Sequence, residues 1–297
     1  MSRSRYYQFK RRIVPYLFVL PSMVTILVFC IFPMFRSLYL SLTHYDIISP
    51  EQSTFIGLEN YLRMFTQDPY VANALINTVI FSFSTTLIGL VLSLAISLIL
   101  CDVFYRVQKI IRSVLFLPVI MSMTIAGLIW SLIYHPSVGI LNYLMNFLGF
   151  PDRAWLGEPG SAMCCLIATA VWKDLGYNIT IWSAGILSLS MEYREAARID
   201  GASWWAEFWR VRMPLLKPVA AILSILSLSN AFQNFDLIYV MTEGGPINST
   251  QVIVYYLWKV AFRDYDMGYA SAIGWVLFVI LAVFSLLQLK MYGKENV

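Results

Sequence analysis

The sequence predicts an all-α, polytopic membrane protein with six transmembrane helices, and three observations lead to this fold class. Only 13 % of the 297 residues are charged, against about 25 % in a typical soluble domain. Long segments such as 69–101 and 267–289 contain no Asp, Glu, Lys or Arg. These segments exceed the roughly 20 helical residues that cross a hydrocarbon core, and lipid requires backbone groups to hydrogen-bond within the segment.

Six apolar segments are long enough to span a membrane, and no low-complexity linker divides them, so a single transmembrane domain over 1–297 is predicted. The fourth segment is the least regular because Lys173 and Asp174 interrupt it. Adjacent side chains leave a helix about 100° apart, so we expect these two to find different partners. The predicted spans lie near 14–36, 74–101, 113–134, 162–187, 217–241 and 269–291.

The first segment follows a basic cluster, as the hydrophobic region of a secretory signal does. Its apolar run, from Ile13 to Phe35, is longer than the roughly 7–15 residues of a signal. No small residues follow in the cleavage pattern, and bulky Phe29 precedes Cys30 where a lipoprotein signal needs a small residue. We therefore expect an uncleaved first span.

The distribution of positive charge orients the spans. With a cytosolic N-terminus, fifteen Lys and Arg residues lie in cytosolic segments and four in outside segments. The positive-inside rule then places both termini, and the segment 192–214, in the cytosol. The net charge of +4 is too small to indicate a nucleic-acid partner, so membrane lipid is the expected surrounding.

The segment 192–214 is the one substantial cytosolic feature and is expected to form a helical hairpin. "EYREAARID" is rich in helix formers and ends at Gly201. A glycine suits a left-handed helix end because it has no Cβ to clash. "ASWWAEFWRVR" predicts a second short helix, which Pro214 is expected to stop.

The side chains of this hairpin allow two interpretations. Ala196 and Ala197 leave a low surface that another protein can approach closely, and three carboxylates offer acceptors to a basic partner. Alternatively, three tryptophans anchor a plain connector among lipid headgroups, as interfacial tryptophans commonly do. The carboxylates are Glu192, Glu195 and Asp200, and the tryptophans are Trp204, Trp205 and Trp209.

The spacing within the hairpin favours a docking element. Three residues separate "EAA", at 195–197, from Gly201, and nine more precede "VRMP", at 211–214. This resembles the EAA loop of importer-type ABC transporter permeases, whose pattern is EAA-x3-G-x9-I-x-L-P. Val211 and Met213 replace the Ile and Leu of the pattern.

The resemblance covers nearly the whole chain. "GLENY" at 57–61, "ALINTVIFS" at 74–82, "FLPVIMS" at 116–122 and "GGP" at 244–246 are similar to segments of carbohydrate-uptake permeases with the MetI-like importer fold. Among these, the "GLENY" opening makes the chain similar to the first permease of a heterodimeric pair for sugars or glycerol phosphate.

The resemblance implies a set of partners. A second permease would lie beside this chain in a bacterial or archaeal cytoplasmic membrane, two ATP-binding subunits would receive the EAA loops, and an extracytoplasmic binding protein would deliver solute. The chain would not be an enzyme, with ATP and Mg held by the partner subunits. The sequence agrees in one respect, since it has no G-x4-G-K-[ST] phosphate loop. The coupling residues implied are Glu192, Glu195, Ala196, Ala197, Asp200, Gly201 and Pro214.

Polar residues inside the fourth and fifth spans are candidates for a substrate pathway. Such residues are costly in lipid and usually functional, and amide, hydroxyl and carboxylate groups beside aromatic rings suit a sugar. The alternative is that they hold helices together, as Ser and Asn often do in membrane bundles. The candidates are Asp174, Tyr177, Asn178, Ser227, Asn230, Gln233 and Asn234.

No metal site is predicted, because His44 and His135 lack companion ligands and the four cysteines show no metal or disulfide spacing. Two other functions stay open. The same architecture could import another polar solute, such as an amino acid or compatible solute. A membrane protein that only recruits or assembles a partner would also need the hairpin, but would not need polar residues within its spans.

Overall fold

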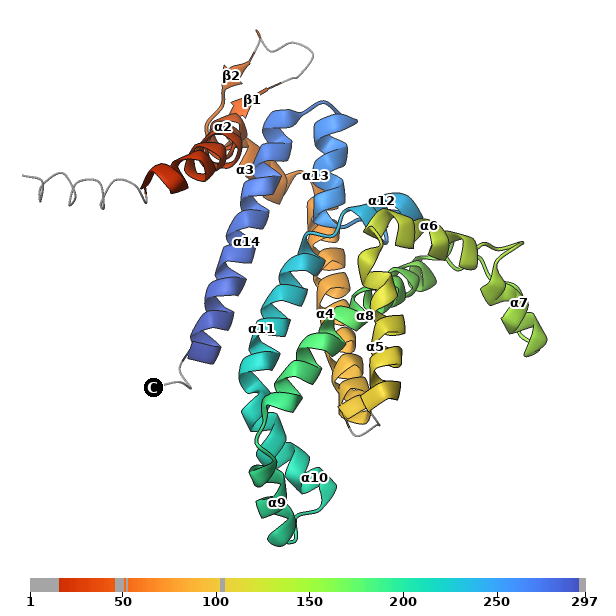
Figure 1. The fold of residues 1–297 in the computed structure, drawn as a ribbon. Helices are drawn as coiled ribbons and strands as arrows, with labels where there is room; N and C mark the ends of the chain where they lie inside the picture. The colour runs from red at the N-terminus through yellow and green to blue at the C-terminus, as the bar shows by residue number, and fades with distance from the viewer. Residues whose placement is uncertain (1–15, 46–50, 52, 102–104, 294–297) are drawn as a thin grey trace, which may run out of the picture. The chain divides into compact units, whose positions relative to one another are not determined.

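The computed structural model describes residues 16–45, 51, 53–101 and 105–293, and helices make up most of them (Figure 1). The two strands in this part of the chain, β1 (Thr43–His44) and β2 (Thr54–Phe55), form one short antiparallel ladder with Thr43 opposite Phe55. The all-α fold class is therefore confirmed. Residues 1–15, which hold the basic cluster and the start of the first predicted span, lie outside the described residues, as does the C-terminal end, 294–297.

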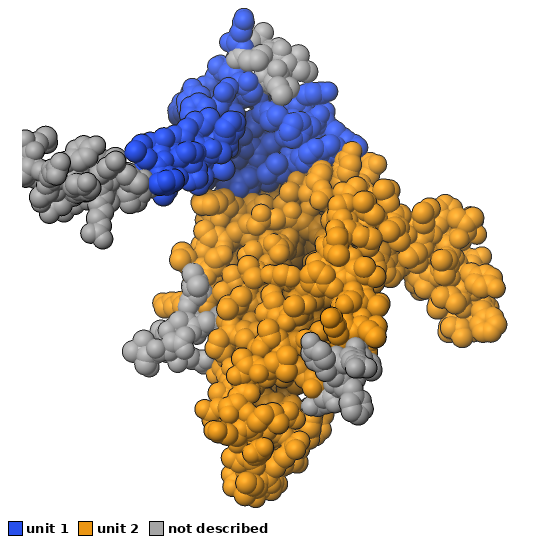
Figure 2. All heavy atoms as spheres, in the orientation of Figure 1, with its two compact units in different colours: residues 1–67, 257–276 blue, residues 68–256, 277–297 orange. Residues whose placement is uncertain are grey.

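The chain divides into two compact units, which we describe separately (Figure 2). Unit 1 comprises 1–67 and 257–276, and unit 2 comprises 68–256 and 277–297. Residues 16–26 are helical, and the helices that follow, with η for π-helical turns, are η1 (Leu27–Ile31), α2 (Phe32–Ser41), α3 (Glu59–Thr66), α4 (Pro69–Cys101), α5 (Tyr105–Ile120), α6 (Met123–Ile133), α7 (Ile140–Phe147), α8 (Pro159–Ser188), α9 (Met191–Ile199), α10 (Trp204–Glu207), η3 (Phe208–Arg212), α11 (Met213–Phe232), α12 (Asp236–Met241), α13 (Ile253–Phe262) and α14 (Met267–Gly293).

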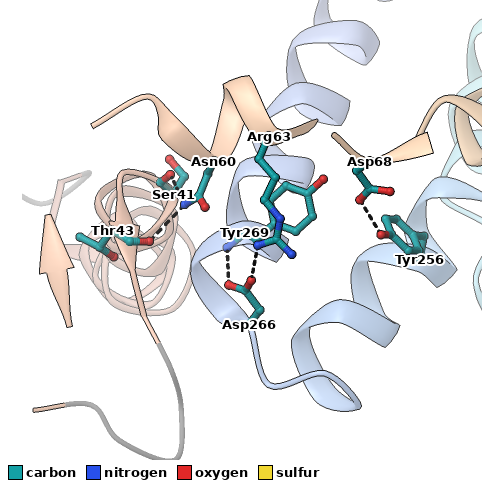
Figure 3. Close-up of polar contacts among 8 residues, drawn as sticks. All are labelled: Ser41, Thr43, Asn60, Arg63, Asp68, Tyr256, Asp266 and Tyr269. Atoms are coloured by element: carbon teal, nitrogen blue, oxygen red, sulfur yellow. Dashed lines mark hydrogen bonds and ion pairs between the residues drawn. The ribbon is translucent and has the colours of Figure 1, made fainter. Parts of the chain in front are cut away.

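In unit 1, a buried amide closes the end of α2. The last carbonyl groups of a helix lack partners within the helix, and Asn60 of α3 supplies one (Figure 3). Its Nδ2 donates to the carbonyl oxygens of Ser41 at 2.9 Å and Thr43 at 3.1 Å. The hydroxyls of Ser41 and Tyr61 lie 2.9 Å apart, which adds a second link between α2 and α3.

A second polar group in unit 1 holds the start of α14 (Figure 3). Asp266 directly precedes this helix, and its Oδ1 accepts from the backbone N–H of Tyr269 at 3.1 Å, as an N-cap does. Its Oδ2 accepts from Arg63 at 2.7 Å. The Arg63 guanidinium also lies 4.1 Å from the centre of the Tyr269 ring.

Unit 2 is built on α4 and α8, which pack against each other and against α11, with α5 on α8. The fully buried core side chains Trp182, Leu216 and Leu223 join α8 to α11. The hydroxyl of Ser97 donates to the Ile179 carbonyl at 3.2 Å. Nearer the first turn of α4, Asp68 accepts from the Tyr256 hydroxyl at 2.6 Å (Figure 3).

Four helical segments are long and apolar enough to cross a membrane, or five if a bent pair counts as one span. The 30-residue helix α8 is not among them, since Lys173 and Asp174 interrupt its apolar character. Helices lie in all six regions that were predicted to span the membrane. That all six cross the membrane stays a prediction. The four segments are Tyr16–Ser41, Pro69–Cys101, Trp204–Phe232 and Met267–Gln288.

Two of the predicted spans are not continuous helices. Within 113–134 the helix bends by 100° between Ile120 and Met123. Pro118 removes one backbone donor from the end of α5, and Ser122 caps the new helix by accepting from Ile125 N–H at 3.2 Å. The region 217–241 is also divided, because α11 ends at Phe232 and α12 begins at Asp236.

Candidate functional site

The hairpin turn has the geometry expected from the sequence. Helix α9 ends at Ile199, and Gly201 has a φ of +75°. The N–H of Ala202 donates to the Ala197 carbonyl at 2.9 Å and that of Gly201 to the Arg198 carbonyl at 3.1 Å. These two bonds form a Schellman motif, in which a left-handed glycine ends a helix. The predicted left-handed helix end at Gly201 is confirmed.

The hairpin has a concave pocket on its surface with a volume of about 700 Å³, which we call the hairpin hollow. Four predicted coupling residues, Ala196, Ala197, Asp200 and Gly201, line it together with Arg210 and the start of α10. Ala197 is buried, so of the two alanines it is Ala196 that is exposed at the hollow. The other three predicted coupling residues are exposed but do not line the hollow: Glu192 and Glu195 lie on α9, and Pro214 lies on α11.

The second helix of the hairpin does not stop at Pro214, contrary to the prediction. Residues Trp204–Phe232 form one continuous helix. A π-helical turn, η3, ends two residues before the proline, with Met213 N–H bonded to the Phe208 carbonyl. Such a turn widens the helix, where the ring of a proline would otherwise meet the carbonyl four residues back.

Glu207, which the sequence analysis did not select, is the centre of the hairpin's charge network. Its carboxylate is buried, and one oxygen, Oε1, accepts from Arg212 at 2.8 and 2.6 Å and from Arg194 at 3.2 Å. Glu207 lies near the start of the continuous helix Trp204–Phe232, ten residues before Lys217, after which the charge-free stretch begins.

The tryptophans face a different surface from the hollow. Trp204, Trp205 and Trp209, with Phe208, line an apolar groove of about 430 Å³ against α4. The rings of Trp204 and Phe208 stack with centroids 5.6 Å apart. Because α4 is one of the membrane-length helices, this side of the hairpin is continuous with the apolar surface of the bundle.

Five of the predicted pathway residues meet at one cavity in unit 2. Asp174 and Asn178 reach it from α8, Ser227 and Asn230 from α11, and Asn234 from the turn after α11. We call this the polar cavity. Its volume is about 50 Å³. Tyr177 and Gln233 do not line it: both are exposed, and the Gln233 amide donates to the Ser229 carbonyl.

Helix α4 contributes a wall of the polar cavity that the sequence analysis missed. Thr85 and Thr86 line the cavity, and their hydroxyls, like Oδ1 of buried Asn178, have no hydrogen-bond partner among the described residues. The signal was present, since hydroxyl residues in an otherwise apolar span are themselves candidates. It was overlooked because no charged or amide residue marks this part of α4.

Lys173 and Asp174 pair with each other, which contradicts the expectation of separate partners. Lys173 Nζ lies 3.6 Å from Asp174 Oδ1. The long lysine stem lets the ammonium turn back across the 100° between the two positions. The lysine side chain is 13 % exposed and that of the aspartate 44 %, so the carboxylate that lines the cavity is also partly open, whereas the lysine is largely buried in the protein.

Membrane-length apolar helices, with polar side chains gathered inside the bundle, define a membrane-embedded transport component. Comparison with known proteins gives the family. The chain belongs to the binding-protein-dependent transport system inner membrane component family, whose model matches residues 1–291.

Curated relatives match over almost their full length. The chain is 36 % identical to the protein named "probable ABC transporter permease protein YurN" of Bacillus subtilis, over 97 % of this chain and 99 % of that protein. It is 34 % identical to the trehalose/maltose transport system permease protein MalF of Thermococcus litoralis, over 93 % and 92 %. It is 30 % identical to the sn-glycerol-3-phosphate transport system permease protein UgpA of Agrobacterium fabrum, over 97 % of each.

Solved structures share the fold. A chain of a bacterial ABC transporter that imports the acidic polysaccharide alginate superposes with a TM-score of 0.85, covering 99 % of this chain and all of that one. A second structure of an alginate transporter, in complex with an alginate-bound periplasmic protein, gives a TM-score of 0.84. Both are 22 % identical to this chain, so they establish the fold alone.

Proposed function

We propose that this chain is one of two permease subunits of an ATP-driven importer for a sugar, an oligosaccharide or a related polyol phosphate. The family supports a transport role, and relatives named for trehalose/maltose, arabinooligosaccharides and sn-glycerol 3-phosphate support the solute class. The polar cavity carries the proposal, because it collects carboxylate, amide and hydroxyl groups where an isolated polar group is costly.

The size of the polar cavity favours a pathway that two chains complete. Ligand pockets for small molecules have about 300–1,000 Å³, whereas this cavity has about 50 Å³, which is room for a few water molecules. Asn230 and the Asp174 carboxylate are also open on one side. A second permease, facing the cavity from that side, would enclose the solute.

Energy and delivery would come from partners. Two ATP-binding subunits would dock at the hairpin hollow and at its counterpart on the second permease, with ATP and Mg bound to them. An extracytoplasmic binding protein would present the solute. In this arrangement the chain lies in a bacterial or archaeal cytoplasmic membrane with both termini in the cytosol, as the positive-inside rule predicts.

The experiment is uptake into vesicles that contain the complex of this chain with its co-expressed partner subunits and binding protein. Trehalose, maltose, an arabinooligosaccharide and sn-glycerol 3-phosphate form the panel. ATP-dependent accumulation of at least one is expected. Accumulation only of amino acids or compatible solutes would establish the alternative substrate class, and no accumulation of any solute by an intact complex would favour a recruitment role.

Paired variants connect this activity to the polar cavity. Asn234→Leu is expected to reduce uptake about three- to tenfold, the effect of losing one hydrogen bond of about 1 kcal/mol, with ATPase binding unchanged. Asn146→Leu is the matched control, because this side-chain amide lies on α7, does not line the polar cavity and donates to Asp152. Equal uptake by the two variants would remove Asn234 from the pathway.

A further inference from the structure

The buried carboxylate of Glu207 connects two segments of the hairpin through a single oxygen atom. Oε1 accepts from Arg194 of α9 and from both Nε and Nη2 of Arg212. The Glu207 and Arg212 side chains are 3 % and 4 % exposed. Charges are buried only when they are paired, and hydrogen bonds between charged groups are short and directional. This arrangement, which we call the Glu207 clamp, therefore fixes the orientation of α9 relative to the following helix.

The local helix geometry produces the clamp. Glu207 and Arg212 are five residues apart, and in an α-helix residues at this spacing point in different directions. The π-helical turn η3 lies between them, and its hydrogen bonds run from each residue to the fifth one along. Residues five apart then lie on the same face, which sets the Arg212 guanidinium directly on the Glu207 carboxylate. Single π turns inside α-helices are frequent at functional sites.

The two arginines of the Glu207 clamp lie on different helical segments, one in the predicted docking helix and one at the start of a helix of the bundle. Arg194 lies on α9, between the predicted docking residues Glu192 and Glu195. Arg212 directly precedes α11, whose next turn places Leu216 in the fully buried core with Trp182 of α8. The clamp thus joins the docking helix to a helix that is itself locked into the bundle.

The helix that begins at the clamp leads to the polar cavity. Residues Trp204–Phe232 form one continuous helix of about 43 Å at 1.5 Å per residue. Ser227 and Asn230 on this helix line the cavity. A rotation or tilt imposed on the cytosolic end would therefore reach the cavity through one rigid element.

We propose that Glu207 is the positioning residue that makes α9 and the Trp204–Phe232 helix move as one body, so that closure of the ATP-binding subunits on the hairpin reshapes the polar cavity. This inference rests on the proposed function as an ATP-driven importer. Glu207 does not contact solute or nucleotide. It acts through Arg194 and Arg212.

Two variants of the assembled complex test the role. Glu207→Gln keeps the size of the side chain and removes its charge, which weakens both arginine contacts. Arg194→Gln cuts the link to α9 and leaves the buried Glu207–Arg212 pair in place. Both variants are expected to retain the ATPase subunits and to hydrolyse ATP, while the solute transported per ATP falls about tenfold, within the range usual for coupling between sites. Arg194→Lys, which retains the charge, should restore part of the ratio.

Controls separate this role from a structural one. Glu158→Gln changes an exposed carboxylate at the start of α8, remote from the hairpin, and should keep the wild-type ratio. A wild-type ratio in both test variants overturns the proposal, and so does loss of the ATPase subunits from both, which indicates that the clamp only supports folding. If the Glu207→Gln complex does not assemble, the amount of solute transported per ATP by the Arg194→Gln complex tests the proposal alone. Failure of the wild-type complex to import any panel solute contradicts the proposed function, before the variants are compared.

Discussion

Gly176 of α8 lies directly against the backbone of α5. A side-chain carbon at this position would overlap the carbonyl oxygen of Leu115 and lie 2.9 Å from the Cα of Phe116. Both are main-chain atoms, which cannot move aside as the end of a flexible side chain can. Small residues allow membrane helices to approach this closely. The contact of α5 with α8, and with it the placement of Lys173 and Asp174 two to three residues earlier, depends on this glycine.

Gly176→Ala is therefore expected to destabilise the subunit, by about 1–3 kcal/mol, as overpacking usually does. Thermal unfolding in detergent measures the effect as a lower Tm. The control is Gly160→Ala in the first turn of the same helix, where an added carbon meets no atom within 4 Å. Equal Tm values for the two variants would contradict the close approach of α5.

Substitutions of Gly201 test the backbone conformation of the hairpin turn, because an added side-chain carbon at this position would not clash with a neighbouring atom. Its φ is +75°, and a Cβ would meet nothing within 4 Å. Gly201→Val is expected to cost about 1–2 kcal/mol from the left-handed backbone alone and to reduce co-purification of the ATP-binding subunits. Gly201→Asn should lose less, because asparagine tolerates this conformation. Equal losses for Val and Asn would show that the partner contacts the glycine itself and that backbone strain is not the cause.

The three tryptophans on the α4 side of the hairpin are expected to lie among lipid headgroups, as amphipathic rings prefer. The chain has nine tryptophans, so replacing Trp204, Trp205 and Trp209 by Phe should remove about a third of the emission, and mainly the part quenched by lipids brominated near the headgroup. Quenching of these three by aqueous iodide would contradict the lipid contact. Trp182→Phe, at a fully buried core position, is the control.

Replacing the same three tryptophans should leave ATPase co-purification unchanged, because their groove is lined by different residues from the hairpin hollow. A loss of the ATP-binding subunits in this variant would assign the tryptophans to the docking surface instead.

The sequence predicted those features that depend on composition and short spacing. Charge-free segments gave the helices, and the "EAA" to Gly201 spacing gave the hairpin and its left-handed turn. The bend after Ile120, the unbroken helix through Pro214 and the Glu207 clamp were not predicted. Each depends on backbone geometry that tertiary contacts select, and a π turn has no sequence signature comparable to a glycine at a helix end.

The candidate pathway was predicted in part for a similar reason. Their polarity within otherwise apolar spans selected Asp174, Asn178 and Asn230, and the structure brings these three residues to one cavity. The sequence could not reveal that Thr85 and Thr86 of α4 supply the third wall of the cavity, because the periodicity of one helix does not show which other helix it faces.

In unit 1, Asp266 combines two interactions whose energies differ, and a pair of variants separates them. The cap to Tyr269 N–H is worth about 1 kcal/mol. The ion pair with Arg63 is worth less, because the Arg63 side chain is 46 % exposed and solvent screens such pairs to about 0–1 kcal/mol. Asp266→Asn keeps an oxygen for the cap and loses the charge, so it should lower Tm slightly. Asp266→Ala loses both interactions and should lower it more. The difference in Tm between Asp266→Asn and Asp266→Ala should be the same in an Arg63→Gln background as in the wild-type background, since the cap does not involve Arg63. A difference that disappears in that background would show that the ion pair, rather than the cap, holds the start of α14.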